Sequence, residues 1–185
     1  MRRTLLKPLL EVGVRIKAAG WNRALPRASR LARRAAHAAF AAAPPRRLPR
    51  AGAEAAVVLA DDAGVRALNR DFRGRDKPTN VLAFAAREGA CPRLRAGEPL
   101  SLGDVVVAFE TARAEARADG RPLADHLRHL VVHGMLHLLG HDHRVLRAAR
   151  RMERLEAKVL ATLDVPDPYA PGAPVIRRRR RRSVR

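Results

Sequence analysis

The segment HGMLHLLGHDH, from His133 to His143, holds the side chains best suited to bind a metal ion. His133 and His137 are four residues apart, so on a helix they share one face about one turn from each other. Gly140 can end that helix and let the chain turn back, which brings His143 toward the first two histidines. Three neutral imidazoles hold one zinc ion and leave a fourth position for water, as in catalytic zinc sites. The spacing therefore predicts one Zn²⁺ per chain, with hydroxide available near neutral pH.

The same spacing occurs in zinc proteases of the pattern H-E-x-x-H-x-x-G-x-x-H. In those enzymes a glutamate follows the first histidine and acts as general base, but here that residue is Gly134, which cannot take a proton. Glu110 or Asp104 would have to replace it, and nothing in the sequence places either near the metal. The sequence therefore disfavours a metalloprotease and leaves the general base unidentified. His129, four residues before His133, has either a structural role or a role at the site, where it would support the ligands or face the substrate.

Four further stretches, taken with the histidine segment, resemble the YbeY family of bacterial endoribonucleases. They are LNRDFRGRDKPTNVLAF from Leu68, LGDVVVAF from Leu102, and the later MERLE and VPDPY segments. The resemblance spans most of residues 10–170. It implies a single-strand-specific, zinc-dependent endoribonuclease that acts in ribosomal RNA maturation, at the 3′ end of 16S rRNA, and in ribosome quality control. Its implied partners are ribosomal RNA and the ribosome.

The resemblance carries the family's metal ligands over to His133, His137 and His143, and its functionally important arginine to Arg73. We expect Arg73 and His133 to be the catalytic residues. A guanidinium presents paired donors that match phosphate oxygens, so Arg73 would hold the scissile phosphate and stabilise its growing negative charge.

Arg75 and Lys77 follow Arg73 in the same charged stretch. We expect them to bind flanking phosphates, so that all three residues are substrate-binding. Where the family usually reads V-L-S-F-P, residues 81–85 read V-L-A-F-A, so a role for the missing serine does not transfer.

Positive charge is concentrated at the two ends of the chain. The 38 lysines and arginines outnumber the 18 acids and give a net charge of +20. Residues 1–50 hold thirteen cations and one acid, and residues 177–185 hold seven arginines and no acid. We expect the basic N-terminal region and the arginine tail to contact RNA phosphates. Aromatic residues make up only 3%, and Trp21 and Tyr169 are far apart, so no base-stacking platform is visible.

Several classes of protein are excluded by the composition. Charged residues interrupt every apolar run before the roughly 18 residues that a membrane span needs, so we expect no membrane contact. The N-terminal MRRTLLKPLL has no apolar core of a signal peptide. Cys91 is the only cysteine, so the chain can form no internal disulfide, and a cytoplasmic location is expected.

The hydrophobic pattern predicts the elements that hold these residues. Strands are expected at 10–16, 55–60, from about 80, and at 103–109; helices are expected at 27–43, 62–69, 111–119, 123–139 and 144–163. These elements predict an α+β fold: a single domain at 1–176 with a mixed sheet of about four strands packed with about five helices. We expect the metal site on a helix and the turn after it, and a basic, disordered tail at residues 177–185.

Two alternatives to the endoribonuclease stay open. The first is a non-catalytic ribosome-assembly factor that binds RNA and is stabilised by zinc, because the basic ends of the chain would serve it equally well. The second and less favoured is the metalloprotease. An open position on the metal would argue for the enzyme, and a fourth protein ligand in its place would argue for the assembly factor.

Overall fold

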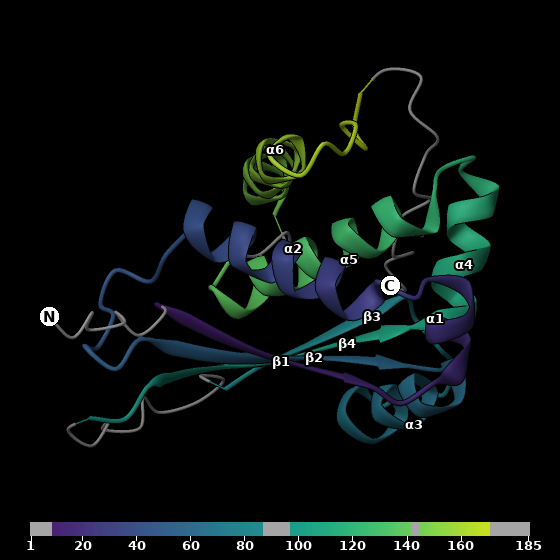
Figure 1. Ribbon diagram of the computed structural model, residues 1–185, viewed down its shortest axis with the longest axis horizontal. Coiled ribbons are helices and arrows are strands. Elements are labelled where there is room, and N and C mark those ends of the chain that lie inside the picture. The colour runs from purple at the N-terminus through teal and green to yellow at the C-terminus, as the bar shows by residue number, and fades with distance from the viewer. Residues whose placement is uncertain (1–8, 87–96, 142–144, 171–185) are drawn as a thin grey trace, which may run out of the picture.

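One four-stranded sheet forms the centre of the computed structural model, which describes residues 9–86, 97–141 and 145–170. The strand order is β1-β2-β4-β3, with β1, β2 and β4 parallel and β3 antiparallel to β4 at one edge (Figure 1). The strands are β1 (Leu10–Ile16), β2 (Ala53–Ala60), β3 (Val81–Ala85) and β4 (Leu100–Ala108). This mixed sheet confirms the predicted single-domain α+β class. The predicted tail at 177–185 lies outside the described residues.

Six helices accompany the sheet in the described ranges, where the sequence predicted about five. They are α1 (Ala19–Ala24), α2 (Ala28–Ala42), α3 (Asp62–Arg73), α4 (Phe109–Ala118), α5 (Leu123–Leu138) and α6 (Leu146–Ala161). The helix that the sequence missed is α1, whose six residues bury only Trp21. A helix this short shows no apolar periodicity. Its position is fixed by tertiary contacts instead, because the indole of Trp21 donates to the carbonyl of Ala60 (3.0 Å).

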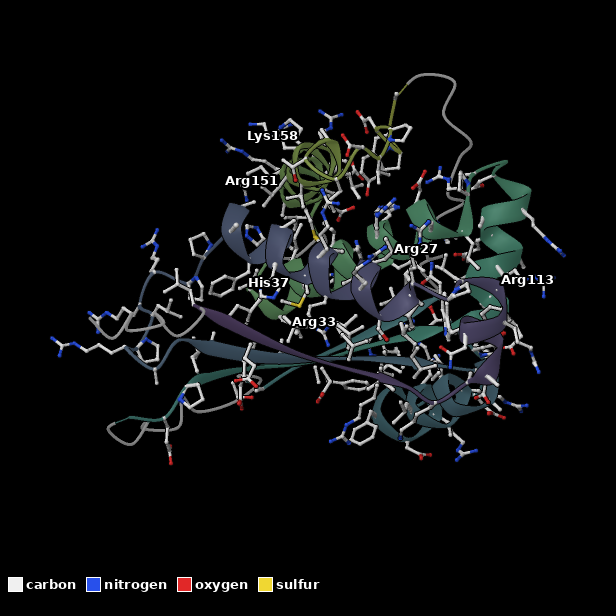
Figure 2. The ribbon with its side chains drawn as sticks, in the orientation of Figure 1. Arg27, Arg33, His37, Arg113, Arg151 and Lys158 are labelled. Carbon is white, nitrogen blue, oxygen red and sulfur yellow. The ribbon has the colours of Figure 1, made fainter. Side chains whose placement is uncertain are left out.

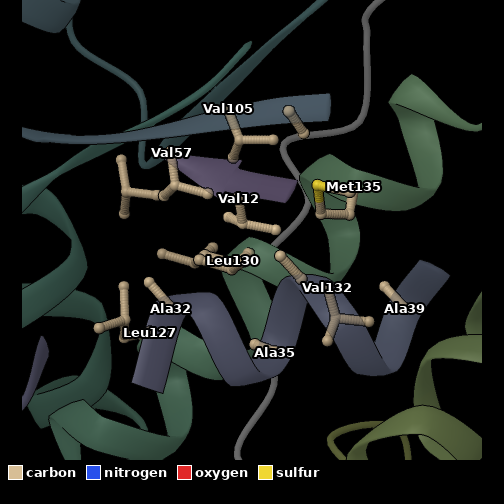
Figure 3. Packing of buried hydrophobic residues seen from close by; sticks show 14 of the residues in the cluster. Val12, Ala32, Ala35, Ala39, Val57, Val105, Leu127, Leu130, Val132 and Met135 are labelled. Carbon is tan, nitrogen blue, oxygen red and sulfur yellow. The ribbon is translucent and has the colours of Figure 1, made fainter. Parts of the chain in front are cut away.

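The helices form layers on the two faces of the sheet (Figure 1). On one face lies α3, whereas α2 and α5 pack against the other, with α6 outside them. The larger core lies between the sheet and the α2–α5 pair, where Val57 and Val105 meet Leu130 (Figure 3). On α2 the buried positions are mostly alanine, and such small side chains allow close approach of α5. The sheet therefore holds α5, with its histidines, on a rigid base.

The end of α3 differs from the sequence prediction. Asp61 caps the helix as expected, since its carboxylate accepts from the amide of Gly64 (2.8 Å). The helix then runs to Arg73 rather than ending near Asn69, and Gly74 ends it in a left-handed conformation at φ +63°. Arg73 therefore belongs to the last helical turn, where the sequence predicted the start of a loop.

None of the helices in the described ranges combines the length and the apolar character that a bilayer crossing needs.

Candidate metal centre

The helix α5 brings His133 and His137 together as their spacing predicted. The two rings lie edge to face with centroids 4.7 Å apart, and their Nε2 atoms are 3.1 Å apart. Two zinc–nitrogen bonds of about 2.0–2.1 Å at a tetrahedral angle place the nitrogens about 3.3–3.4 Å apart. The observed separation is close to that value, so the two Nε2 atoms fit two positions around one zinc ion.

The third ligand predicted from the sequence, His143, lies outside the described residues. Within the described ranges, no group of three potential ligand side chains is gathered at one point. The turn that must redirect the chain is present: Gly140 has φ +88°, and the amide of His141 donates to the carbonyl of Leu136 (2.9 Å). This Schellman motif ends α5 directly after His137, at the predicted break.

Glu156 of α6 is hydrogen-bonded to Nδ1 of His133. Its carboxylate is fully buried; Oε1 accepts from Nδ1 of His133 (2.8 Å), and Oε2 accepts from Nε2 of His129 (3.0 Å) and from the Tyr169 hydroxyl. An ionised carboxylate can only accept hydrogen bonds, so Nδ1 of His133 carries the proton and Nε2 presents its lone pair beside His137. Carboxylates commonly orient metal-binding histidines in this way.

The Glu156 carboxylate is ionised despite its burial. Burial by itself raises its pKa, but the hydrogen bonds from His129 and His133 outweigh burial and leave the pKa well below its ordinary value. Burial lowers the pKa of His129, against the opposing effect of its bond to Glu156. No arginine or lysine of the described ranges pairs with this carboxylate. A cation on Nε2 of His133 would balance the buried charge through the imidazole, so the donor set fits a metal ion.

Sequence reasoning gave Glu156 and Tyr169 no role, although both lie in segments that carried the family resemblance. One signal could have identified Glu156. It falls on the apolar face of α6, four residues after Met152 and three before Val159, both of which are buried. A carboxylate at such a core position is rare unless it has partners.

A second histidine–carboxylate pair lies nearer the start of α5. Nε2 of His126 is 2.9 Å from Oε2 of Glu115 on α4, and the same oxygen accepts from Nδ2 of Asn80 (2.9 Å). This pair contains none of the predicted metal ligands. It ties α5 to α4 and to the start of β3, which is a structural role.

Gly134 packs directly against β4. A Cβ at this position would lie 2.6 Å from Cγ1 of Val105, closer than unbonded carbons approach. The glutamate of the zinc-protease pattern therefore has no room here, and its side chain would start toward the sheet. Glu110, considered as a replacement base, instead accepts from the amide of Asp62 at the start of α3 (2.8 Å). The described residues thus give no support to the metalloprotease.

Arg73 lies on α3, across the sheet from α5 and its histidines (Figure 1). Its Nη2 donates to the carbonyl of Ala83 on edge strand β3 (3.1 Å), and its guanidinium lies 5.9 Å from the centroid of the Phe84 ring. Arg75 and Lys77 are exposed in the connection that follows. No hydrogen bond or ion pair in the described ranges joins these three cations to the histidines. The structure therefore gathers the predicted phosphate-binding residues at β3, apart from the predicted metal ligands on α5.

Further cations stand on the outer helices. Figure 2 labels Arg27 just before α2, Arg33 on α2, Arg113 on α4, and Arg151 and Lys158 on α6. Of the five exposed cations of α6, four recur every three or four residues, so they form one stripe on the side opposite Glu156. They are Arg147, Arg151, Arg154 and Lys158.

Comparison with known proteins adds a family to this geometry. Residues 22–164 match the family model described as "Endoribonuclease YbeY". A relative of that name from Paramagnetospirillum magneticum is 49% identical over 160 residues, which cover 86% of this chain and 96% of the relative. Another, from Rhodopseudomonas palustris, is 53% identical over 120 residues, or 65% of this chain and 69% of the relative.

A solution structure from Thermotoga maritima is also similar, with a TM-score of 0.49 at 19% identity over 87% of this chain and all of that one. Because that similarity is weak, the family assignment comes from the relatives in sequence.

Proposed function

Because the chain belongs to the YbeY family of endoribonucleases, we propose that it is a single-strand-specific, zinc-dependent endoribonuclease of the cytoplasm. We further propose that it acts in maturation of ribosomal RNA, at the 3′ end of 16S rRNA, and in ribosome quality control. Ribosomal RNA and the ribosome are its partners in this proposal.

The observation that carries the metal dependence is the arrangement of His133, His137 and Glu156. The two Nε2 atoms converge at 3.1 Å, and the buried carboxylate fixes the tautomer of the first histidine. His143 is the third ligand in the proposal. Zinc held there would supply Lewis acidity and lower the pKa of water at the site toward neutrality.

The cations of α3 and the connection after it would bind the substrate. Arg73 uses one N–H for the carbonyl of Ala83, and its remaining donors stay available for the oxygens of the scissile phosphate. Arg75 and Lys77 would hold flanking phosphates. The helices α3 and α5 lie on opposite faces of the sheet (Figure 1), and Arg73 reaches a carbonyl of the edge strand β3. An RNA strand that contacts both Arg73 and the histidines would therefore pass over the edge of β3.

The exposed cations of α2 and α6 support an RNA partner more broadly. They extend the basic surface over the outer helices (Figure 2). We include the basic N-terminal region and the arginine tail among the phosphate contacts. Such contacts position RNA without reading its sequence, and they make binding depend on salt.

The test is cleavage of a ribosomal RNA fragment by the zinc-loaded protein, beside Arg73→Ala and His137→Ala. Two matched controls are available in the chain. Arg113 lies 5.9 Å from the Phe109 ring centroid, as Arg73 does from Phe84, and His141 is a neighbouring histidine that is not a proposed ligand. Cleavage should be lost in Arg73→Ala and His137→Ala, and kept in Arg113→Ala and His141→Ala.

Other outcomes would change the proposal. If all five proteins cut the RNA equally, the activity comes from a contaminating nuclease. If none cuts it but all bind it, the protein is a zinc-stabilised assembly factor rather than an enzyme.

A further inference from the structure

An exposed aromatic side chain stands beside the predicted phosphate-binding cations. Phe72, in the last turn of α3, is 70% exposed. Its ring meets that of Phe84 on β3 edge to face, with centroids 5.3 Å apart and planes at 67°. Sequence reasoning considered only Trp21 and Tyr169 as stacking residues, and it missed this pair because the fold, not the sequence, brings the two phenylalanines together.

The surroundings of Phe72 are held rigid. Two parallel hydrogen bonds of 2.7 Å join the guanidinium of Arg66 to the carboxylate of Asp76. The side-chain amide of Asn69 donates to the backbone carbonyl of Lys77 (2.7 Å). These bonds tie the connection after α3 back to the helix, so the ring and the adjacent cations keep a fixed relation. A preformed surface binds a ligand with less loss of conformational entropy than a mobile one.

The charges around Phe72 favour an anion. The two nearby acids are neutralised, Asp71 by Arg70 (2.9 Å) and Asp76 by Arg66 (2.7 Å). The remaining cations are exposed and make no ion pair with any carboxylate of the described ranges; they are Arg73, Arg75 and Lys77. An accessible aromatic face bordered by uncompensated cations matches a nucleotide, in which a flat base adjoins a phosphate.

We propose that Phe72 is a stacking site for an unpaired base of RNA, whose neighbouring phosphates bind Arg73, Arg75 and Lys77. The inference rests on the proposed function for its ligand and adds a base-binding subsite to it. A base inside a duplex has no free face to offer to a side chain, so this subsite selects single strands. The strand continues from Phe72 past Ala83, over the edge of β3, toward the histidines on the other face.

The experiment measures binding of a fluorescein-labelled oligoadenylate RNA to the full-length protein in a His137→Ala background, which prevents cleavage from consuming the probe. Phe72→Leu keeps an apolar side chain and removes the aromatic face. Leu9→Ala is the matched control, because Leu9 is an uncharged side chain that is 67% exposed just before β1. Stacking on one aromatic side chain predicts that Phe72→Leu weakens binding roughly 5- to 150-fold, with Leu9→Ala unchanged.

Salt and an abasic probe separate stacking from charge. The Phe72→Leu variant should lower affinity at every salt concentration without changing the slope of log K against log salt, whereas Arg75→Ala should make that slope shallower. An oligonucleotide of the same length without bases should bind Phe72→Leu and the background protein with equal affinity. In Phe72→Trp, a base that stacks on the new indole should quench its fluorescence. The native Trp21 is completely buried, so its own fluorescence should not respond to RNA.

The outcomes distinguish this subsite from the proposed function. If RNA binds through Phe72 but the wild-type protein never cuts it, the subsite stands and the endoribonuclease does not. If the wild type cuts RNA while Phe72→Leu binds it as tightly as the background protein, the subsite is wrong and the enzyme stands. Stacking would also be overturned if Phe72→Leu lost as much affinity for the abasic probe as for oligoadenylate, since the abasic probe has no base to stack.

Discussion

Replacing Glu156 by glutamine tests whether α6 positions His133, the proposed metal ligand. The two carboxylate oxygens accept from three groups: His133 on Oε1, and His129 and Tyr169 on Oε2. An amide keeps only one oxygen and puts an NH₂ group in place of the other. In either orientation at least one buried donor therefore faces a donor instead of an acceptor.

The size of the effect follows from this loss. A buried donor without a partner costs about 1–3 kcal/mol, so the free energy of unfolding should fall by that amount. Loss of a carboxylate behind a metal-binding histidine also weakens metal binding, typically 10- to 100-fold. We therefore expect the zinc dissociation constant of Glu156→Gln to rise by about one to two orders of magnitude, as measured by competition with a chromophoric chelator.

Glu115→Gln is the matched control. Glu115 also lies within 2.9 Å of a histidine of α5, but that histidine, His126, is not a proposed ligand. This variant should lose stability and keep the zinc affinity of the wild type. Tyr169→Phe, which removes one donor to Glu156 and leaves His133 in place, should have a small effect on zinc.

The reasoning would be refuted by an equal change of zinc affinity in the Glu115 and Glu156 variants. It would be refuted equally by a Glu156→Gln protein that loses stability and binds zinc as tightly as the wild type. In that case the buried carboxylate would be a structural group only.

Three further predictions concern other parts of the chain. Gly134→Ala should lower the free energy of unfolding by about 1–3 kcal/mol in chemical denaturation, because the new methyl group overlaps Val105, whereas Gly13→Ala, whose Cβ would meet nothing within 4 Å, should not. The hydrogen bond from Arg66 lowers the pKa of Asp76, so this pair stabilises the fold above the ordinary carboxyl pKa and loses that contribution as pH falls through the lowered value. Carboxyl NMR titration should show the lowered pKa of Asp76 in the wild type, and in Arg66→Ala this pKa should return to its ordinary value. Deleting residues 177–185 should make the slope of log K for RNA against log salt shallower by up to about 5, and an unchanged slope would leave the tail without phosphate contacts.

Local patterns were sufficient to predict most of the elements. The alternation in residues 10–16 predicted β1, and Gly140 predicted the end of α5, because these signals depend on neighbours in the chain. The shared face of His133 and His137 followed from helix geometry alone. The short helix α1 could not be predicted in this way, because a buried tryptophan fixes it rather than a repeat of apolar residues. The last turn of α3 was missed although Gly74, which ends it, is a local signal of the same kind as Gly140.

The sequence by itself determined the donor types and their spacing: two histidines one turn apart, a glycine after them, and a run of cations before the third strand. Only the tertiary structure decided what stands around them. Glu156 is 23 residues from His133 and Phe84 is 12 from Phe72, yet the side chains of each pair are in contact. Val105 is 29 residues from Gly134, yet a methyl group added at Gly134 would overlap it. Such contacts depend on how helices and strands pack, and packing couples residues whose distance along the chain carries no information about their distance in space.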